Sequence, residues 1–174
     1  MGLDMFLKKY PKIEGLTWQD YKAIAMYKLW VESDSDLSFE EYSGGISEKE
    51  LPDMKTVFKF MKALDGGEEV GYWRKANAIH RWFVENVQGG KDDCNYHDPV
   101  TKDHLIKLRD ICNEVLEDHS KAKSLLPTMD GFFFGPTDYD EFYFEHLEYT
   151  KKLCEKLIEE FDFENYELYY VSSW

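Results

Sequence analysis

The chain has 174 residues, of which 43% are hydrophobic and 17% aromatic, so it can bury one sizeable core and is unlike a disordered chain. Its formal net charge of -14, with most of the acidic excess in residues 91–174, argues against direct nucleic-acid binding, because such a surface repels phosphate backbones. Three widely spaced cysteines, no recognisable signal peptide and no membrane-length apolar run predict a cytoplasmic protein with free thiols and no membrane contact.

The first half of the chain contains signals for one strand and two helices. The weakly alternating residues 1–7 predict an edge strand. Thr17 and Asp20 have the spacing of a capping box, so a helix is expected to begin at Thr17. Residues 33–45 are polar and predict at most one short helical turn. A second helix is expected from Pro52 along an apolar stripe of Met54, Val57, Phe58, Met61 and Leu64.

The segment GYWRKANAIHRWF, residues 71–83, is predicted to be a third helix, because its apolar residues follow helical spacing. The core face of this helix would hold Ala76, Ile79, Phe83 and Val87. A second stripe beside that face would hold Trp73, Asn77, His80 and Val84. The cationic side chains further round the helix would be Arg74 and Lys75.

The last part of the chain predicts two more helices and two strands. Thr101 is expected to cap a helix that buries Leu105, Leu108, Ile111, Cys112 and Val115. Phe132–Phe134 lie between turn signals and predict a buried strand. Thr137 and Asp140 have the spacing of a capping box before a long helix, and residues 166–174 predict a terminal strand. The sequence therefore predicts a mostly helical α+β single domain over residues 1–174, with a small sheet formed by the termini and the FFF segment.

Asn77 and His80 are the most informative pair in the third helix. They border its apolar face, where a buried polar group without a partner costs about 1–3 kcal/mol. One interpretation is that the chain itself satisfies them, for example from the GPTDYD turn at residues 135–140. The other is that they line a cleft and bind a ligand.

The second interpretation nominates as ligand-binding residues Trp73, Arg74, Asn77 and His80, with Lys75, Tyr139 and Asp140 as second choices. Rings stack on a planar base and cations pair with phosphate, so this set suits a planar anionic ligand such as a nucleotide. A second copy of the chain, in a homo-oligomer, could complete such a pocket. The leading prediction is a small-ligand-binding protein without catalytic residues, cofactor or metal.

Two other function classes stay open. The first is an inhibitor that docks on a basic, nucleic-acid-binding partner protein through Glu155, Glu159 and Glu160. The second is a hydrolase of a nucleotide signal that uses His80 as acid or base. The pairs His80 with Asp140 and Cys94 with His97 can be drawn, but no GxSxG, HExxH or P-loop motif accompanies them. The Cys94-x-x-His97 spacing lacks a second pair of zinc ligands, so no metal site is predicted.

The block GYWRKANAIH, with the MGLDM start, GFFFG followed by TDYDEFYFE and the terminal YVSSW, resembles a family of small proteins from phages and bacteria. The likeness touches both ends and the middle of the chain, and residues 31–53 are its least family-like part. The family has no settled activity, so the resemblance supplies no catalytic residues. It implies a phage or prophage context and an accessory role in the host cytoplasm. Such a role would be counter-defence, by sequestering a host immune signal or by binding a host defence protein.

Overall fold

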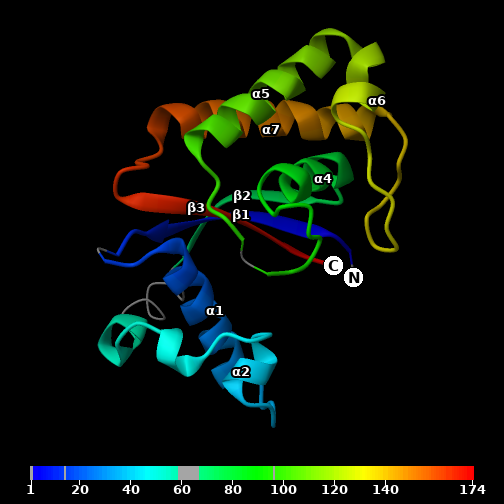
Figure 1. Cartoon of the computed structure of the whole chain (residues 1–174). Helices are drawn as coiled ribbons and strands as arrows, with labels where there is room; N and C mark the ends of the chain where they lie inside the picture. Colours follow the sequence, from blue (N-terminus) through cyan, green and yellow to red (C-terminus); the bar gives the residue numbers. More distant parts are fainter. Residues whose placement is uncertain (1, 14, 59–66, 96) are drawn as a thin grey trace. The chain divides into compact units, whose positions relative to one another are not determined.

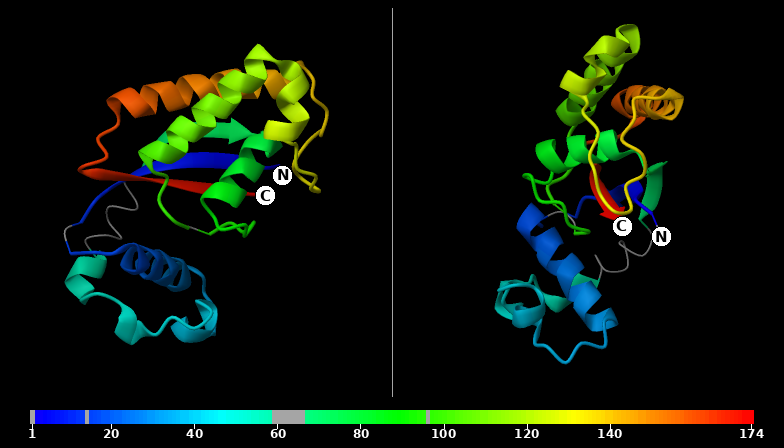
Figure 2. Two further views of the ribbon diagram at one scale, coloured as in Figure 1. Left: turned by 45° about the horizontal axis from the view of Figure 1, so that its top comes forward. Right: turned by 90° about the vertical axis from the view of Figure 1, so that its right-hand side faces the viewer.

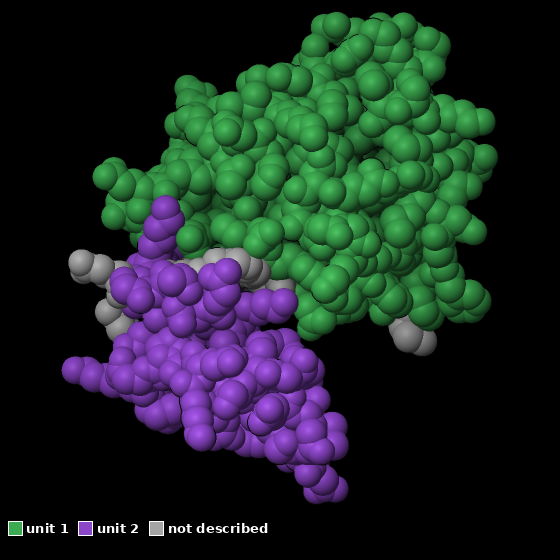
Figure 3. All heavy atoms as spheres, viewed as in Figure 1, with its two compact units in different colours: residues 1–9, 69–174 green, residues 10–68 purple. Residues whose placement is uncertain are grey.

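The computed structural model describes residues 2–13, 15–58, 67–95 and 97–174. These residues form two compact units, which Figure 3 colours green and purple. One unit comprises residues 1–9 and 69–174, and the other comprises residues 10–68. One domain over residues 1–174 stays a prediction.

A three-stranded antiparallel sheet forms the base of the larger unit. Its strands are β1 (Asp4–Pro11), β2 (Glu68–Arg74) and β3 (Tyr166–Ser173), in the order β2-β1-β3. Both ends of the chain supply strands to this sheet, as predicted, and they pair side by side (Figure 1). The predicted edge position of the first strand is wrong, because β1 lies between β2 and β3. The fold is mostly helical α+β, which confirms the predicted class.

Three helices lie on one side of this sheet: α4 (Asn77–Asn86), α5 (Lys102–Glu117) and α7 (Glu141–Glu160) (Figures 1 and 2). Alternate residues at the start of the chain are fully buried against them: Leu3, which precedes β1, and Met5 and Leu7 within β1. The predicted apolar stripe of α5 is buried at Leu105, Leu108, Cys112 and Val115, and Thr101 caps this helix as predicted. The core therefore lies between the sheet and the helices.

The FFF segment is not a strand, so this part of the predicted sheet is wrong. Its backbone turns instead, because the N–H of Phe134 donates to the carbonyl of Gly131 (3.1 Å) and Gly135 has a positive φ of 85°. Beside the sheet, the N–H of Leu3 donates a hydrogen bond to the carbonyl of Phe133 (3.0 Å). Three apolar residues between turns are too few to carry a ladder of strand hydrogen bonds.

The start of α7 also differs from the prediction. Its N-cap is Asp140, whose carboxylate accepts a hydrogen bond from the N–H of Tyr143 (3.0 Å). The predicted cap, Thr137, lies three residues earlier, in the loop before the helix. Asp and Thr are both good N-caps, so composition alone did not distinguish them.

The smaller unit contains α1 (Trp18–Glu32), α2 (Phe39–Tyr42) and the short 3₁₀ turn Glu48–Glu50. The predicted capping box is present, since the Thr17 hydroxyl accepts from the N–H of Asp20 and the Asp20 carboxylate accepts from the N–H of Thr17. Residues 54–58 are helical, as predicted. The rest of that predicted helix, including Met61 and Leu64, lies outside the described residues. A small core of this unit is centred on Ile24 and Val57.

Candidate functional site

The segment predicted as the third helix divides into a strand and a helix at Lys75. β2 ends at Arg74, α4 begins at Asn77, and Lys75 between them adopts a positive φ of 58°. Two glycines make room for this turn: a Cβ on Gly135 would lie 3.1 Å from the Lys75 Cβ, and one on Gly2 would lie 3.2 Å from the Lys75 Cε. The predicted helix over residues 71–76 is therefore wrong, because a left-handed residue ends the strand and turns the chain.

Asn77 is held by three backbone groups of the loop before α7. Its Nδ2 donates to the carbonyls of Phe134 (3.1 Å) and Pro136 (2.8 Å), and its Oδ1 accepts from the N–H of Met129 (3.3 Å). The side chain is buried. The chain itself therefore supplies the hydrogen-bond partners of Asn77. One of them, Pro136, belongs to the GPTDYD turn that was expected to satisfy this side chain.

His80 is fully buried and both of its ring nitrogens have partners. Nδ1 lies 2.7 Å from the Tyr170 hydroxyl, and Nε2 lies 3.0 Å from Oδ1 of Asp92. Burial lowers the pKa of His80, and the nearby Asp92 carboxylate only partly opposes this. Asp92 also accepts a hydrogen bond from the indole of Trp174 (3.2 Å). His80 thus connects α4 to β3 and to the end of the chain, and its carboxylate partner is Asp92, not Asp140.

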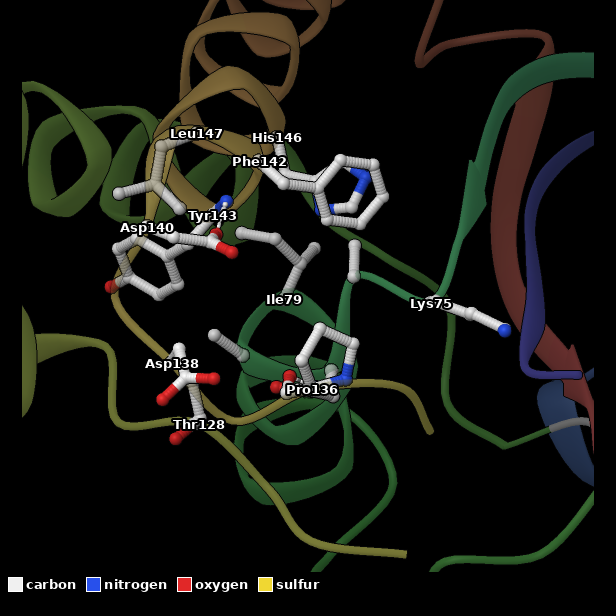
Figure 4. Close-up of a pocket in the computed structure, with 13 residues that line it drawn as sticks. Lys75, Ile79, Thr128, Pro136, Asp138, Asp140, Phe142, Tyr143, His146 and Leu147 are labelled. Carbon is white, nitrogen blue, oxygen red and sulfur yellow. Dashed lines mark hydrogen bonds between the residues drawn. The ribbon is translucent and has the colours of Figure 1, made fainter. Parts of the chain in front are cut away.

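The cavity beside Asn77 is too small for a nucleotide. It has room for about 20 Å³, the space of roughly one water molecule (Figure 4). Asp138 and Asp140 line it, and Lys75 extends away from it in Figure 4. Asp140 caps α7, while the Tyr139 hydroxyl accepts a hydrogen bond from the N–H of Thr128 (3.3 Å). The structure gives these two second-choice residues roles within the chain.

A larger groove between β2 and α7 adjoins this cavity, and Lys75, Phe142 and His146 line both. It has a volume of about 450 Å³, within the usual range for small-molecule sites, and is lined by Tyr72, Trp73, Arg74, Lys75, Phe142, His146 and Tyr149. Three of these were predicted ligand residues: Trp73, Arg74 and Lys75. Gly71 lets α7 approach β2 closely, because a Cβ there would lie 2.6 Å from Cδ2 of Leu153.

Sequence reasoning missed the α7 side of the groove. Phe142, His146 and Tyr149 are spaced i, i+4 and i+7 along α7, so they share one helix face. This stripe is readable in the sequence once the helix is predicted. It was overlooked because it adjoins the core stripe, which includes Tyr143 and Leu147.

Aromatic rings form most of the groove wall. The side chains of Tyr72, Phe142 and Tyr149 are 39%, 44% and 43% exposed, which is high for rings that contact other residues. Trp73 is buried behind them, where its indole donates to the hydroxyl of Thr150 (2.8 Å) and its ring meets Tyr149 edge-on at 5.9 Å. Of the three exposed rings, Tyr149 therefore packs directly on the buried Trp73.

Two cations meet at one end of the groove. A Cβ placed on the buried Gly2 would lie 3.2 Å from the Lys75 Cε and 3.4 Å from the Arg74 Nη2, so the ends of these two side chains are close together. Asp4 pairs with Arg74 through Nη1 (3.2 Å) and also accepts a hydrogen bond from the Tyr72 hydroxyl. Burial lowers the pKa of His146 in the groove wall, so its imidazole is neutral near pH 7. The end of the groove thus carries two positive charges and one negative charge.

The described part of the chain shows neither a metal centre nor a membrane span. Among those residues, no group of three or more His, Cys, Asp or Glu side chains is placed to hold an ion. None of their helices combines the length and apolar character needed to cross a bilayer. No protein-family model, curated protein or solved structure matches the chain.

Proposed function

We propose that this protein binds a small planar anionic molecule, such as a nucleotide or a nucleotide-derived signal, in the groove between β2 and α7. The observation that carries the proposal is the meeting of three exposed rings with Arg74 and Lys75 around about 450 Å³. The proposed ligand site is therefore this groove and not Asn77 and His80, whose polar atoms already have hydrogen-bond partners within the chain.

The chemistry of the groove supports this class of ligand. A planar base can stack on Phe142 or Tyr149, and stacking contributes about 1–3 kcal/mol per base. A phosphate can pair with guanidinium and ammonium groups. The chain as a whole has a net charge of -14 and repels anions, so a local pair of cations is a specific feature of this surface.

The resemblance to small phage and bacterial proteins supports a setting for this activity. A phage protein that sequesters a nucleotide-derived signal of host immunity needs tight binding and no catalytic group. Its partner would be the signal molecule itself, and its site of action the host cytoplasm. Nucleotides recovered intact after incubation with the protein would separate such a binder from a hydrolase.

The proposal is tested by identifying what the protein holds. The purified protein is denatured, and the released small molecules are examined by mass spectrometry. Calorimetry with mono-, di- and cyclic nucleotides then measures affinity directly. We expect at least one nucleotide-derived molecule to bind. An empty preparation together with no heat of binding across the panel would contradict the proposal.

Phe142→Ala and Arg74→Ala are each expected to weaken nucleotide binding by about tenfold or more, because one removes a stacking surface and the other a charge partner. Titration calorimetry measures the change. Phe132→Ala and Lys123→Ala are the matched controls, since they remove an exposed ring and an exposed cation outside the groove. Equal losses in the control variants would show that the groove is not the site.

A second candidate function rests on the C-terminal part of α7. Glu155, Glu159 and Glu160 are exposed there, and the last turn of the helix has no basic residue. Carboxylates at a helix C-terminus interact unfavourably with the helix dipole, so they do not stabilise the helix. Such a surface is suited to docking on a basic partner protein, such as a nucleic-acid-binding defence protein.

Charge reversal separates the two candidates. If α7 docks on a basic partner, the triple variant E155K/E159K/E160K is expected to abolish capture of that partner, whereas Phe142→Ala has no effect. Capture should also weaken as salt is raised, because exposed charges are screened. Capture that persists in the triple variant or is insensitive to salt would contradict docking through these glutamates.

A further inference from the structure

Asp4 contacts two residues that line the cationic end of the groove, Tyr72 and Arg74. Asp4 lies in β1 and Arg74 lies in the neighbouring strand β2, on the face of the sheet opposite the buried Met5. Its Oδ1 accepts from both the Tyr72 hydroxyl and Nη1 of Arg74 (3.2 Å). One carboxylate thus restrains two of the groove-lining side chains.

The Asp4 carboxylate leaves part of the local positive charge unpaired. Arg74 contacts it through Nη1, while Nη2 lies toward Gly2, on the same side as the end of the Lys75 side chain. No ion pair of Lys75 is found among the described residues. Arg74 is also more than half exposed in this pair, at 56%, against 26% for Asp4. Water and solutes therefore reach the guanidinium.

We propose that Asp4 acts as an internal counter-ion, which competes with the phosphate of the bound molecule for Arg74, and that this phosphate binds to Arg74 and Lys75 where they line the groove. The proposal rests on the function assigned to the groove and specifies where the anionic group binds. Asp4 is then a specificity-determining residue: it holds Arg74 and Tyr72 in place in the free protein and disfavours weakly charged anions.

Loss of the negative charge of Asp4 should therefore strengthen the binding of a phosphate-containing ligand. Asp4→Asn removes the negative charge and keeps an oxygen that can accept from Tyr72. We expect this variant to bind adenosine 5′-monophosphate about three- to tenfold more tightly than the wild type at low salt. The gain should shrink in high salt, where the charges are screened. Adenosine, which lacks the phosphate, should bind both proteins equally.

Titration calorimetry with adenosine 5′-monophosphate and adenosine decides the matter, with three further variants as references. Lys75→Gln and Arg74→Ala should weaken binding of the nucleotide and leave adenosine unchanged, because each removes one cation of the groove. Phe142→Ala should weaken both, because it acts on the base. Asp4→Asn that leaves nucleotide affinity unchanged or lowers it would overturn the counter-ion proposal. In that case, loss of both ligands in Phe142→Ala would still support the groove as a binding site.

A wild-type protein that binds neither probe would overturn the phosphate subsite as well. The nucleotide panel used for the groove then decides separately whether any planar anion binds. To exclude a folding defect, thermal unfolding is measured for each variant. Lys123→Ala, which removes a cation outside the groove, controls for the change in net charge.

Discussion

Replacement of Asn77 by alanine is expected to lower the free energy of unfolding by about 2–4 kcal/mol. The variant would leave the carbonyls of Phe134 and Pro136 and the N–H of Met129 without their side-chain partner. The cavity beside Asn77 has room for about one water molecule, which can replace only part of these bonds. The loop before α7 would also lose its attachment to α4. Urea unfolding followed by circular dichroism measures the change.

Asn86 provides the matched control, because it is an asparagine in the same helix. Its Nδ2 donates to the carbonyl of Trp82 within α4 (2.8 Å), and its Oδ1 accepts from the exposed Lys107 (2.6 Å). Asn86→Ala is expected to cost less than about 1 kcal/mol, since surface substitutions away from buried networks have small effects. If the two variants unfold alike, Asn77 is not an anchor of the loop. It would then return as a candidate ligand residue.

The local signals in the sequence predicted the ends of several elements correctly. Thr17 and Thr101 cap helices, because a capping box is formed by residues only three positions apart. The presence of strands at both termini was also predicted, since alternation and β-branched or aromatic content are local properties. The central position of β1 was not predicted, because it depends on pairing with the distant β2 and β3. These features need no knowledge of the rest of the chain.

The pairing of distant residues could not be predicted in the same way. Asn77 finds its partners 52 to 59 positions away, and the Tyr170 hydroxyl lies 90 positions from His80. The sequence showed that both polar side chains needed hydrogen-bond partners, but groups of the chain itself and a bound ligand met that requirement equally well. The choice depended on the path of the loop before α7, which has no regular secondary structure.

The candidate site was predicted in part for a related reason. The cations and the indole of residues 73–75 were identified by their density in one short segment, and that property does not depend on secondary structure. The opposite wall, Phe142 with His146 and Tyr149, belongs to another element, and its role appears only when α7 packs beside β2. The positive φ of Lys75 ends β2 before α4 begins, so that Arg74 lines the groove while Asn77 is buried against the loop before α7.

The second large effect that we expect is acid destabilisation through His80. Burial lowers the pKa of this histidine below its ordinary value of 6.5, so the folded protein binds the proton less readily than the unfolded chain. The stabilising contribution is therefore complete above about pH 6.5 and is lost as the pH falls toward the lower pKa of the folded state. His104 and His146 have pKa values lowered by burial and act in the same direction. Each can change the free energy of unfolding by at most about 1.4 kcal/mol per pH unit.

Urea unfolding between pH 7.5 and 5 tests this contribution in the wild type and His80→Gln. Glutamine cannot take up a proton, so His80→Gln should be less stable near neutral pH and should lose less stability as the pH falls. Parallel pH profiles for the wild type and His80→Gln would mean that the imidazole between Tyr170 and Asp92 takes up its proton equally well in the folded and unfolded chains. The Asp92 carboxylate would then offset the whole cost of burial, and the connection between α4, β3 and Trp174 would persist in acid.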